Sequence, residues 1–223
     1  MVKMAEQYSD DVVMQGQLRN KAQKSLEYLV SLVNDILDMN KLQSGDLKDH
    51  QLTFDSMDFL REINRIYYNK AAEKNIKYVV DWDKVNFKHS ILIGNPVYLG
   101  RALSNIASNA VKFSPSSSTI TVWGYEEPID DKHVLYTLYC KDEGEGMTED
   151  FIKHAFDMFS QQNQTSRTKY EGSGLGLAIS KKLIERMGGS IKLDSKKGVG
   201  TTAIIKIPFE LGNMDTIGNI DYE

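Results

Sequence analysis

The sequence predicts an α+β fold, a two-layer sandwich in which helices cover one face of a mixed, largely antiparallel sheet, preceded by a long helix. Three observations predict it: helical apolar spacing over residues 22–40, short β-branched and aromatic runs separated by turns, and amphipathic helical segments between those runs. Strands joined as hairpins give antiparallel neighbours. The intervening helices then gather on one face of the sheet.

The long helix occupies most of a first region, residues 1–48. Its seam positions alternate spacings of four and three, which is typical of a helix that packs against a partner. They are Ala22, Leu26, Leu29, Val33, Ile36 and Asn40, flanked by Leu32 and Leu37. The partner could be another helix of the same chain, a second copy of the chain in a dimeric bundle, or the domain that follows, and the length of the seam favours the bundle. Residues 1–16 are polar and predict a loop or frayed helix, and Gly45 predicts a left-handed cap.

A second region, residues 51–209, carries the predicted α/β domain. We expect strands at 51–55, 77–82, 90–93, 119–125, 133–141, 190–194 and 201–208, and helices at 57–71, 96–112 and 174–187. Asn95 and Pro96 open the middle helix, and Gly188 with Gly189 ends the last one. Trp82 and Trp123 are interpreted as core residues.

The third region, residues 210–223, has little apolar periodicity and predicts an acidic linker or tail. The chain has 27 basic and 31 acidic residues, and the carboxylates of this tail account for its net charge of −4. The folded part is therefore close to neutral, so nucleic acid is not an expected partner.

Other features exclude further classes of protein. Cys140 is the single cysteine, so a disulfide framework or cysteine zinc cage is excluded and a reducing compartment is expected. The chain has no apolar run of about 18 residues that could span a bilayer. A cytoplasmic location is expected, and an anchor elsewhere in a longer protein is left open.

Three glycine clusters carry the expected chemistry: 142–147 (DEGEGM) after a strand, 172–177 (GSGLGL) at a helix start, and 198–201 (GVGT) in a hairpin turn. One such cluster is usually only a tight turn. Three in one domain indicate a phosphate site, because backbone amides at a helix start favour anions. Asp142 before the first glycines can accept a hydrogen bond from the exocyclic amine of adenine, worth about 1.5–3 kcal/mol.

Asn105, Asn109 and Lys112 share one face of the helix at 96–112. Two amides on an apolar helix face could cap neighbouring backbone. They could also include a carboxamide ligand for Mg²⁺ beside a lysine for phosphate, since Mg²⁺ prefers oxygen ligands.

Five ordered segments carry a family resemblance: NIASNAVKFS, DEGEGM, FDMF, GSGLGLAIS and GVGT. The domain resembles the catalytic ATP-binding region of sensor histidine kinases, whose fold is shared with type II topoisomerases, Hsp90 and MutL. The stretch SLVNDILDMNKLQSGDL resembles the second helix of the dimerisation and phosphotransfer domain of these kinases.

The resemblance implies a Mg-ATP site. Asn109 would hold Mg²⁺, Asn105 and Lys112 would share the catalytic role with it, and Asp142 would recognise adenine. Residues 147–171 would form a lid over ATP, with Phe156 and Phe159 at its root. The implied ATP-binding residues are Asn105, Asn109, Lys112, Phe113, Asp142, Gly144, Gly146, Met147, Phe159, Arg167, Lys169, Gly172, Ser173, Gly174, Leu175, Gly176, Leu177 and Thr201.

Asn105 separates the branches of this fold. Hydrolytic relatives carry a glutamate there that activates water, whereas an amide takes no proton at neutral pH. The sequence therefore favours a phosphotransferase, a protein-histidine kinase of two-component signal transduction. The alternatives are an ATPase or serine kinase of the same fold, and a nucleotide-free scaffold or pseudokinase.

The histidine that such a kinase would phosphorylate is not expected on this chain. His50, His89, His133 and His154 each lack the following acidic residue of the family's phosphoacceptor. We therefore expect a fragment that does not label itself. The expected partners are ATP, the phosphoacceptor region, a response-regulator receiver domain, and a second subunit in a homodimeric full-length protein. The tail leaves a following receiver domain open, as in hybrid kinases.

Overall fold

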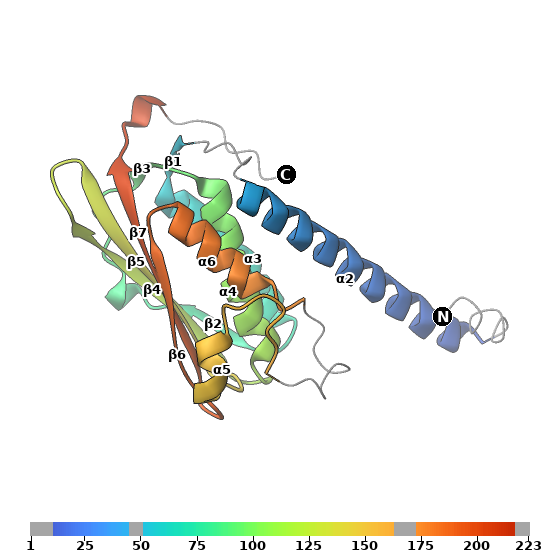
Figure 1. Cartoon of the computed structure of the whole chain (residues 1–223). Coiled ribbons are helices and arrows are strands. Elements are labelled where there is room, and N and C mark those ends of the chain that lie inside the picture. The colour runs from blue at the N-terminus through green and yellow to red at the C-terminus, as the bar shows by residue number, and fades with distance from the viewer. Residues whose placement is uncertain (1–10, 45–50, 163–172, 217–223) are drawn as a thin grey trace.

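The computed structural model describes residues 11–44, 51–162 and 173–216. Figure 1 shows a twisted sheet with helices packed on one face, and a long helix, α2 (Val12–Ser44), that runs out from the helical side. The predicted two-layer α+β architecture with a preceding helix is thus confirmed.

Within the described residues, seven strands form one mixed sheet in the order β1-β3-β7-β5-β4-β2, with β6 paired to β7. The β2–β4 pair is parallel and the others are antiparallel. The strands are β1 (Leu52–Asp55), β2 (Lys77–Val80), β3 (Ile91–Gly94), β4 (Thr119–Pro128), β5 (His133–Asp142), β6 (Ser190–Lys196) and β7 (Gly200–Leu211).

Most of the described helices begin where the sequence supplies a capping side chain. Asn95 accepts the amide of Tyr98 at 3.0 Å and precedes Pro96, the first residue of α4 (Pro96–Phe113). The other helices are α3 (Ser56–Ala72), α5 (Glu149–His154) and α6 (Gly176–Arg186), with 3₁₀ turns η1 (Trp82–Lys84) and η3 (Met214–Thr216).

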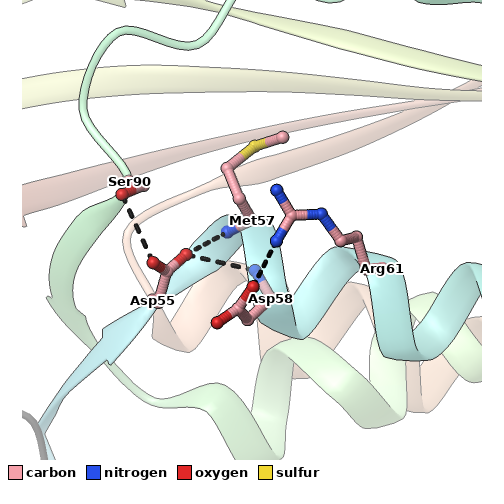
Figure 2. A network of polar contacts seen from close by, with 5 residues as sticks. All are labelled: Asp55, Met57, Asp58, Arg61 and Ser90. Atoms are coloured by element: carbon pink, nitrogen blue, oxygen red, sulfur yellow. Dashed lines mark hydrogen bonds and ion pairs between the residues drawn. The ribbon is translucent and has the colours of Figure 1, made fainter.

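The start of α3 is fastened to the edge of the sheet by Asp55 (Figure 2). One carboxylate oxygen accepts the amides of Met57 at 2.8 Å and Asp58 at 3.1 Å, while the Ser90 hydroxyl donates to the other at 3.5 Å. Arg61 pairs with Asp58 on the exposed side of the first turn. The cap thus joins β1, α3 and the approach to β3.

The core lies between the sheet and the helices. Ile106 of α4 and Ile184 of α6 pack on Tyr136, Ile205 and other inward residues of the central strands. Alternate residues of β5 and β7 are buried, as expected for a sheet with one covered face. This packing places the ends of α4, β5 and the start of α6 close together.

The structure corrects or completes the predicted local structure at four places. Of the two alternatives for residues 1–16, a loop or a frayed helix, residues 12–16 are helical, because Asp11 caps α2 by accepting the Met14 amide at 2.9 Å. Trp82 lies in η1 and is 62% exposed, so it is not a core residue. β7 continues to Leu211, where Leu211 and Glu210 pair with β3 beyond the predicted start of the linker. Helix α5, capped by Thr148, was not predicted.

The α2 seam is largely uncovered by the described residues. Leu26, Leu29, Val33, Ile36 and Leu37 are exposed, whereas Leu32 packs against the α4–α6 side of the domain. Packing on the following domain therefore accounts for only part of the apolar face. The predicted cap at Gly45 lies outside the described residues.

Candidate functional site

A cleft of about 360 Å³ opens between α4, the loop after β5, and the segment leading into α6. Apolar side chains line much of it, including Ile106, Met147, Leu177, Leu193 and Ala203. Polar side chains of Asn105, Asn109, Lys112, Asp142 and Thr201 also line it. An apolar surface with a few polar groups is typical of a ligand site.

Asp142 is the strongly perturbed acid of this cleft. Burial raises the pKa of its carboxyl to about 6, opposed by hydrogen bonds from the amides of Gly144 at 2.8 Å and Thr201 at 3.3 Å. Both amides donate to Oδ1, so Oδ2 has no hydrogen-bond partner among the described residues. The second oxygen is available to accept a donor from a ligand.

The loop after β5 is held on both sides by backbone hydrogen bonds. The Glu145 amide donates to Phe113 of α4 at 3.2 Å, and the Glu145 carbonyl accepts the Gly198 amide at 2.7 Å. A Cβ at Gly146 would lie 2.0 Å from the Lys196 carbonyl oxygen, at a φ of +62°. Close backbone packing therefore requires glycine at this position, independently of any ligand.

The side-chain amides of Asn105 and Asn109 on α4 differ in their hydrogen bonding. Asn105 Nδ2 donates to the Gly176 carbonyl at 3.1 Å, which ties α4 to the start of α6. Asn109 is half-buried, and its amide has no hydrogen bond within the described part of the chain. The Lys112 ammonium lies 4.8 Å from the centre of the Phe113 ring at the same end of the helix. Asn109 is thus the amide free to bind a ligand.

The segment before α6 completes the cleft with Ser173, Gly174, Gly176 and Leu177. Gly174 has a φ of +72°, and a Cβ there would lie 2.7 Å from the backbone of Phe159. The first turn of α6 leaves backbone amides without helical partners, which gives this end of the cleft a positive potential.

Most of the site residues expected from the sequence meet in this cleft, and three do not line it. Gly144 is buried against Asp142 and Phe113, and Leu175 is buried in the α4–α6 cluster. Phe159 is 63% exposed with a φ of +63°. The expected contacts from Arg167, Lys169 and Gly172, and most of the lid, lie outside the described residues.

Sequence reasoning missed several residues that line the cleft, notably Leu32, Asp35, Glu145 and Gln162. Gln162 accepts the Thr148 amide at 3.0 Å and donates to the Gly146 carbonyl at 3.4 Å. Glu145 lies inside the first glycine cluster, which was a usable signal. Leu32 and Asp35 come from α2, and local sequence gives no sign that this helix reaches the cleft.

The cleft could hold a metal ion only together with ligands that a nucleotide and water supply. Among the described residues, no group of three or more His, Cys, Asp or Glu side chains could hold a metal. The Asn109 carboxamide can supply an oxygen, and Mg²⁺ is commonly bound by one or two protein oxygens together with water and substrate phosphates. The residues present therefore fit Mg²⁺ that arrives with a nucleotide.

The fold and the cleft are together typical of a nucleotide-binding domain. Residues 94–211, just over half of the chain, match the family of histidine kinase-, DNA gyrase B-, and HSP90-like ATPases, and the chain belongs to this family. Within it the chain is homologous to sensor histidine kinases and contains their catalytic ATP-binding domain.

Two relatives illustrate the similarity. The sensor protein GacS of Pseudomonas syringae pv. syringae is 33% identical over 181 residues, 80% of this chain and 19% of that protein. The autoinducer 2 sensor kinase/phosphatase LuxQ of Vibrio parahaemolyticus is 31% identical over 182 residues, 82% of this chain and 21% of that protein. The chain spans about a fifth of the length of these relatives.

Solved structures of histidine kinases have a similar fold. Full-length ShkA in complex with AMPPNP is 26% identical with a TM-score of 0.71, covering 89% of this chain and 40% of that chain. The mycobacterial sensor histidine kinase MprB is 25% identical with a TM-score of 0.53, covering 74% of this chain and 100% of that chain.

Proposed function

We propose that this chain is the Mg-ATP-binding kinase module of a two-component sensor, and that it transfers the γ-phosphate of ATP to a histidine outside the chain. The observation that carries the proposal is the pairing of Asp142, with its free Oδ2, and Asn109 in one cleft. The first suits the adenine amine. The second suits a phosphate-bound Mg²⁺ at the other end of a nucleotide.

The side chains have separate tasks in this proposal. Ile106, Leu193 and Ala203 offer an apolar surface for the adenine ring. Lys112 and the start of α6 lie where they can neutralise phosphate charge. Asn109 would hold Mg²⁺, which when bound supplies charge neutralisation at the phosphates. Catalysis then rests on positioning and electrostatics.

The cleft is poorly equipped to activate water. Among the described residues, its carboxylates are Asp35, Asp142 and Glu145. Asp35 accepts a hydrogen bond from Ser173, and Glu145 pairs with Lys197 at 3.5 Å. The unpartnered Oδ2 of Asp142 would be taken by the adenine amine in this proposal, which keeps it from acting on water at the phosphates. The family resemblance implies that Asn105 stands where hydrolytic members of this fold carry a glutamate. We therefore expect slow ATP hydrolysis and a γ-phosphate that persists until a nucleophile arrives.

The phosphoacceptor, the receiver domain and the second subunit also belong to the proposal. The exposed seam of α2 supports a homodimeric bundle in the longer protein, since one helix leaves this apolar face uncovered. No described helix is long and apolar enough to span a bilayer, and we propose that this module works in the cytoplasm.

Thermal unfolding with and without Mg-ATP tests the nucleotide site. Saturating Mg-ATP should raise the Tm of the wild-type chain, because a ligand that binds the folded state stabilises it. Asp142→Asn and Asn109→Ala should each lose most of this shift. A wild-type chain unaffected by Mg-ATP would instead support the nucleotide-free scaffold.

Transfer is tested with γ-labelled ATP and a separately supplied phosphoacceptor helix pair of a sensor kinase. Acid-labile label should appear on that helix pair and not on this chain, with Asp142→Asn inactive. Rapid release of inorganic phosphate without transfer would favour the ATPase alternative, and acid-stable label would favour the serine kinase.

A further inference from the structure

The long helix α2 contributes a charged side chain to the cleft. Asp35 lines the cleft beside Ser173, and its side chain is only 15% exposed. Its Oδ2 accepts a hydrogen bond from the Ser173 hydroxyl at 2.8 Å. Its Oδ1 lies 3.7 Å from Nη2 of Arg101 on α4. One carboxylate therefore links α2 to α4 and to the segment that leads into α6.

Apolar contact holds α2 at this place. Leu32, one helical turn before Asp35, packs against a cluster formed by Tyr98, Leu175, Ile179 and Leu183. Arg101 is half-buried, and this desolvation lowers the pKa of its guanidinium while the Asp35 charge opposes the shift. The ion pair is thus partly shielded from water, where charge interactions are stronger than at an open surface.

Asp35 acts on the end of the cleft that faces α6. The Ser173 hydroxyl that donates to Asp35 also accepts the Leu175 amide at 3.2 Å, immediately before α6 begins. A carboxylate near a helix N-terminus is stabilised by the same positive potential that attracts phosphate. Asp35 therefore draws on the electrostatic potential that the terminal phosphate of a nucleotide would use.

We propose that Asp35 is a specificity-determining residue that makes the α2-docked state prefer ADP over ATP. The inference rests on the proposed nucleotide function. The additional phosphate of ATP brings further negative charge toward the Asp35 carboxylate and competes for Ser173. Binding of ATP consequently favours release of α2, and docking of α2 weakens ATP by the same factor, as thermodynamic linkage requires.

Calorimetric Kd values for Mg-ATP and Mg-ADP test this in the intact chain. Asp35→Asn removes the charge with little change in shape, and should raise the preference for ATP relative to ADP by about threefold to tenfold. Asp35→Glu keeps the charge and should preserve the wild-type ratio. Asp131→Asn, on the exposed turn between β4 and β5, removes an equal charge far from the cleft and should leave the ratio unchanged.

Hydrogen exchange gives a second measurement that a purely structural role would not move. Amides of α2 around Leu32 and Asp35 should exchange faster in the wild type with Mg-ATP than with Mg-ADP, and this difference should disappear in Asp35→Asn. Equal ATP-to-ADP ratios in wild type and Asp35→Asn would overturn the inference and leave the nucleotide site intact. Absence of binding of either nucleotide to the wild type would instead overturn the proposed function.

Discussion

Burial of Asp142 destabilises the ionised form of its carboxyl. The buried carboxyl has a pKa of about 6, against an ordinary value of 3.8, because burial penalises its ionised form. The two amides that donate to Oδ1 offset only part of this penalty. The ionised form is the better acceptor for an amine, so in the proposed function the group that lowers stability in the empty protein would strengthen the contact with adenine.

A pH prediction follows from the raised pKa of Asp142. Its contribution to folding is most favourable below the unfolded pKa and is lost as pH rises through about 6. Without nucleotide, Asp142→Asn should therefore be more stable than wild type by about 1–3 kcal/mol near pH 8, and the difference should shrink toward zero near pH 4. Urea unfolding at both pH values measures it. A difference that is independent of pH would contradict the assignment, and Asp131→Asn serves as the exposed control.

Among the elements, the turn between β6 and β7 is built around the loop after β5. Gly198 donates to the Glu145 carbonyl, and Ser195 accepts the Met147 amide at 2.9 Å and hydrogen bonds to Thr201 at 2.8 Å. A Cβ at Gly200 would lie 2.0 Å from the Asp142 carbonyl oxygen. The hairpin thus fixes the Asp142 loop, which explains why two distant glycine clusters are needed at one site.

Gly146 and Gly198 allow two effects of a substitution by alanine to be compared, the backbone strain and the steric clash of the added Cβ. Gly146 and Gly198 both have positive φ, +62° and +79°, so alanine at either site pays for a left-handed backbone, about 1 kcal/mol. Only Gly146→Ala would also drive a Cβ against the Lys196 carbonyl, because no atom lies within 4 Å at Gly198. We expect Gly146→Ala to lose at least about 2 kcal/mol more unfolding free energy than Gly198→Ala. Equal losses in urea denaturation would refute this.

At the scale of the molecule, α2 contributes much less to the buried core than the domain that follows it. The buried clusters come from β1 and the elements after it, and among the described residues α2 adds Leu32 at their margin. The first residues of the expected linker, unlike most of α2, are attached to the domain. Gly212 donates to the Ile91 carbonyl at 2.9 Å, and Thr216 donates to Thr53 at 3.2 Å, so this part of the chain packs on the sheet edge.

Removal of residues 1–50 should therefore leave a folded domain. We expect a single cooperative unfolding transition and a Tm within about 5 °C of the intact chain, since little buried apolar area is lost. Differential scanning calorimetry measures both quantities. Loss of cooperative unfolding would show that α2 is part of the domain core.

Local sequence was sufficient for most elements and for much of the site. The cap at Asn95, the hairpin between β4 and β5, and the periodicity of α3 are short-range signals, and each element formed where it was expected. Asn109 and Asp142 were chosen from the helix face at 96–112, the first glycine cluster and the family resemblance; the structure puts both in one cleft, and their roles there stay predictions. Trp82 failed as a core residue because hydrophobicity alone does not say which face a short turn presents.

The sequence by itself determined most of the elements, the mixed sheet and several of the polar groups that line the cleft, because these depend on local periodicity, capping and motifs. Only the tertiary structure decided that glycines 146 and 200 are demanded by backbone packing, that Asn105 is tied to α6, and that Asp35 of α2 reaches the cleft. Each of these depends on contacts between segments far apart in the chain. Such contacts are set by the shape of the packed core and leave no periodic trace in the residues that make them.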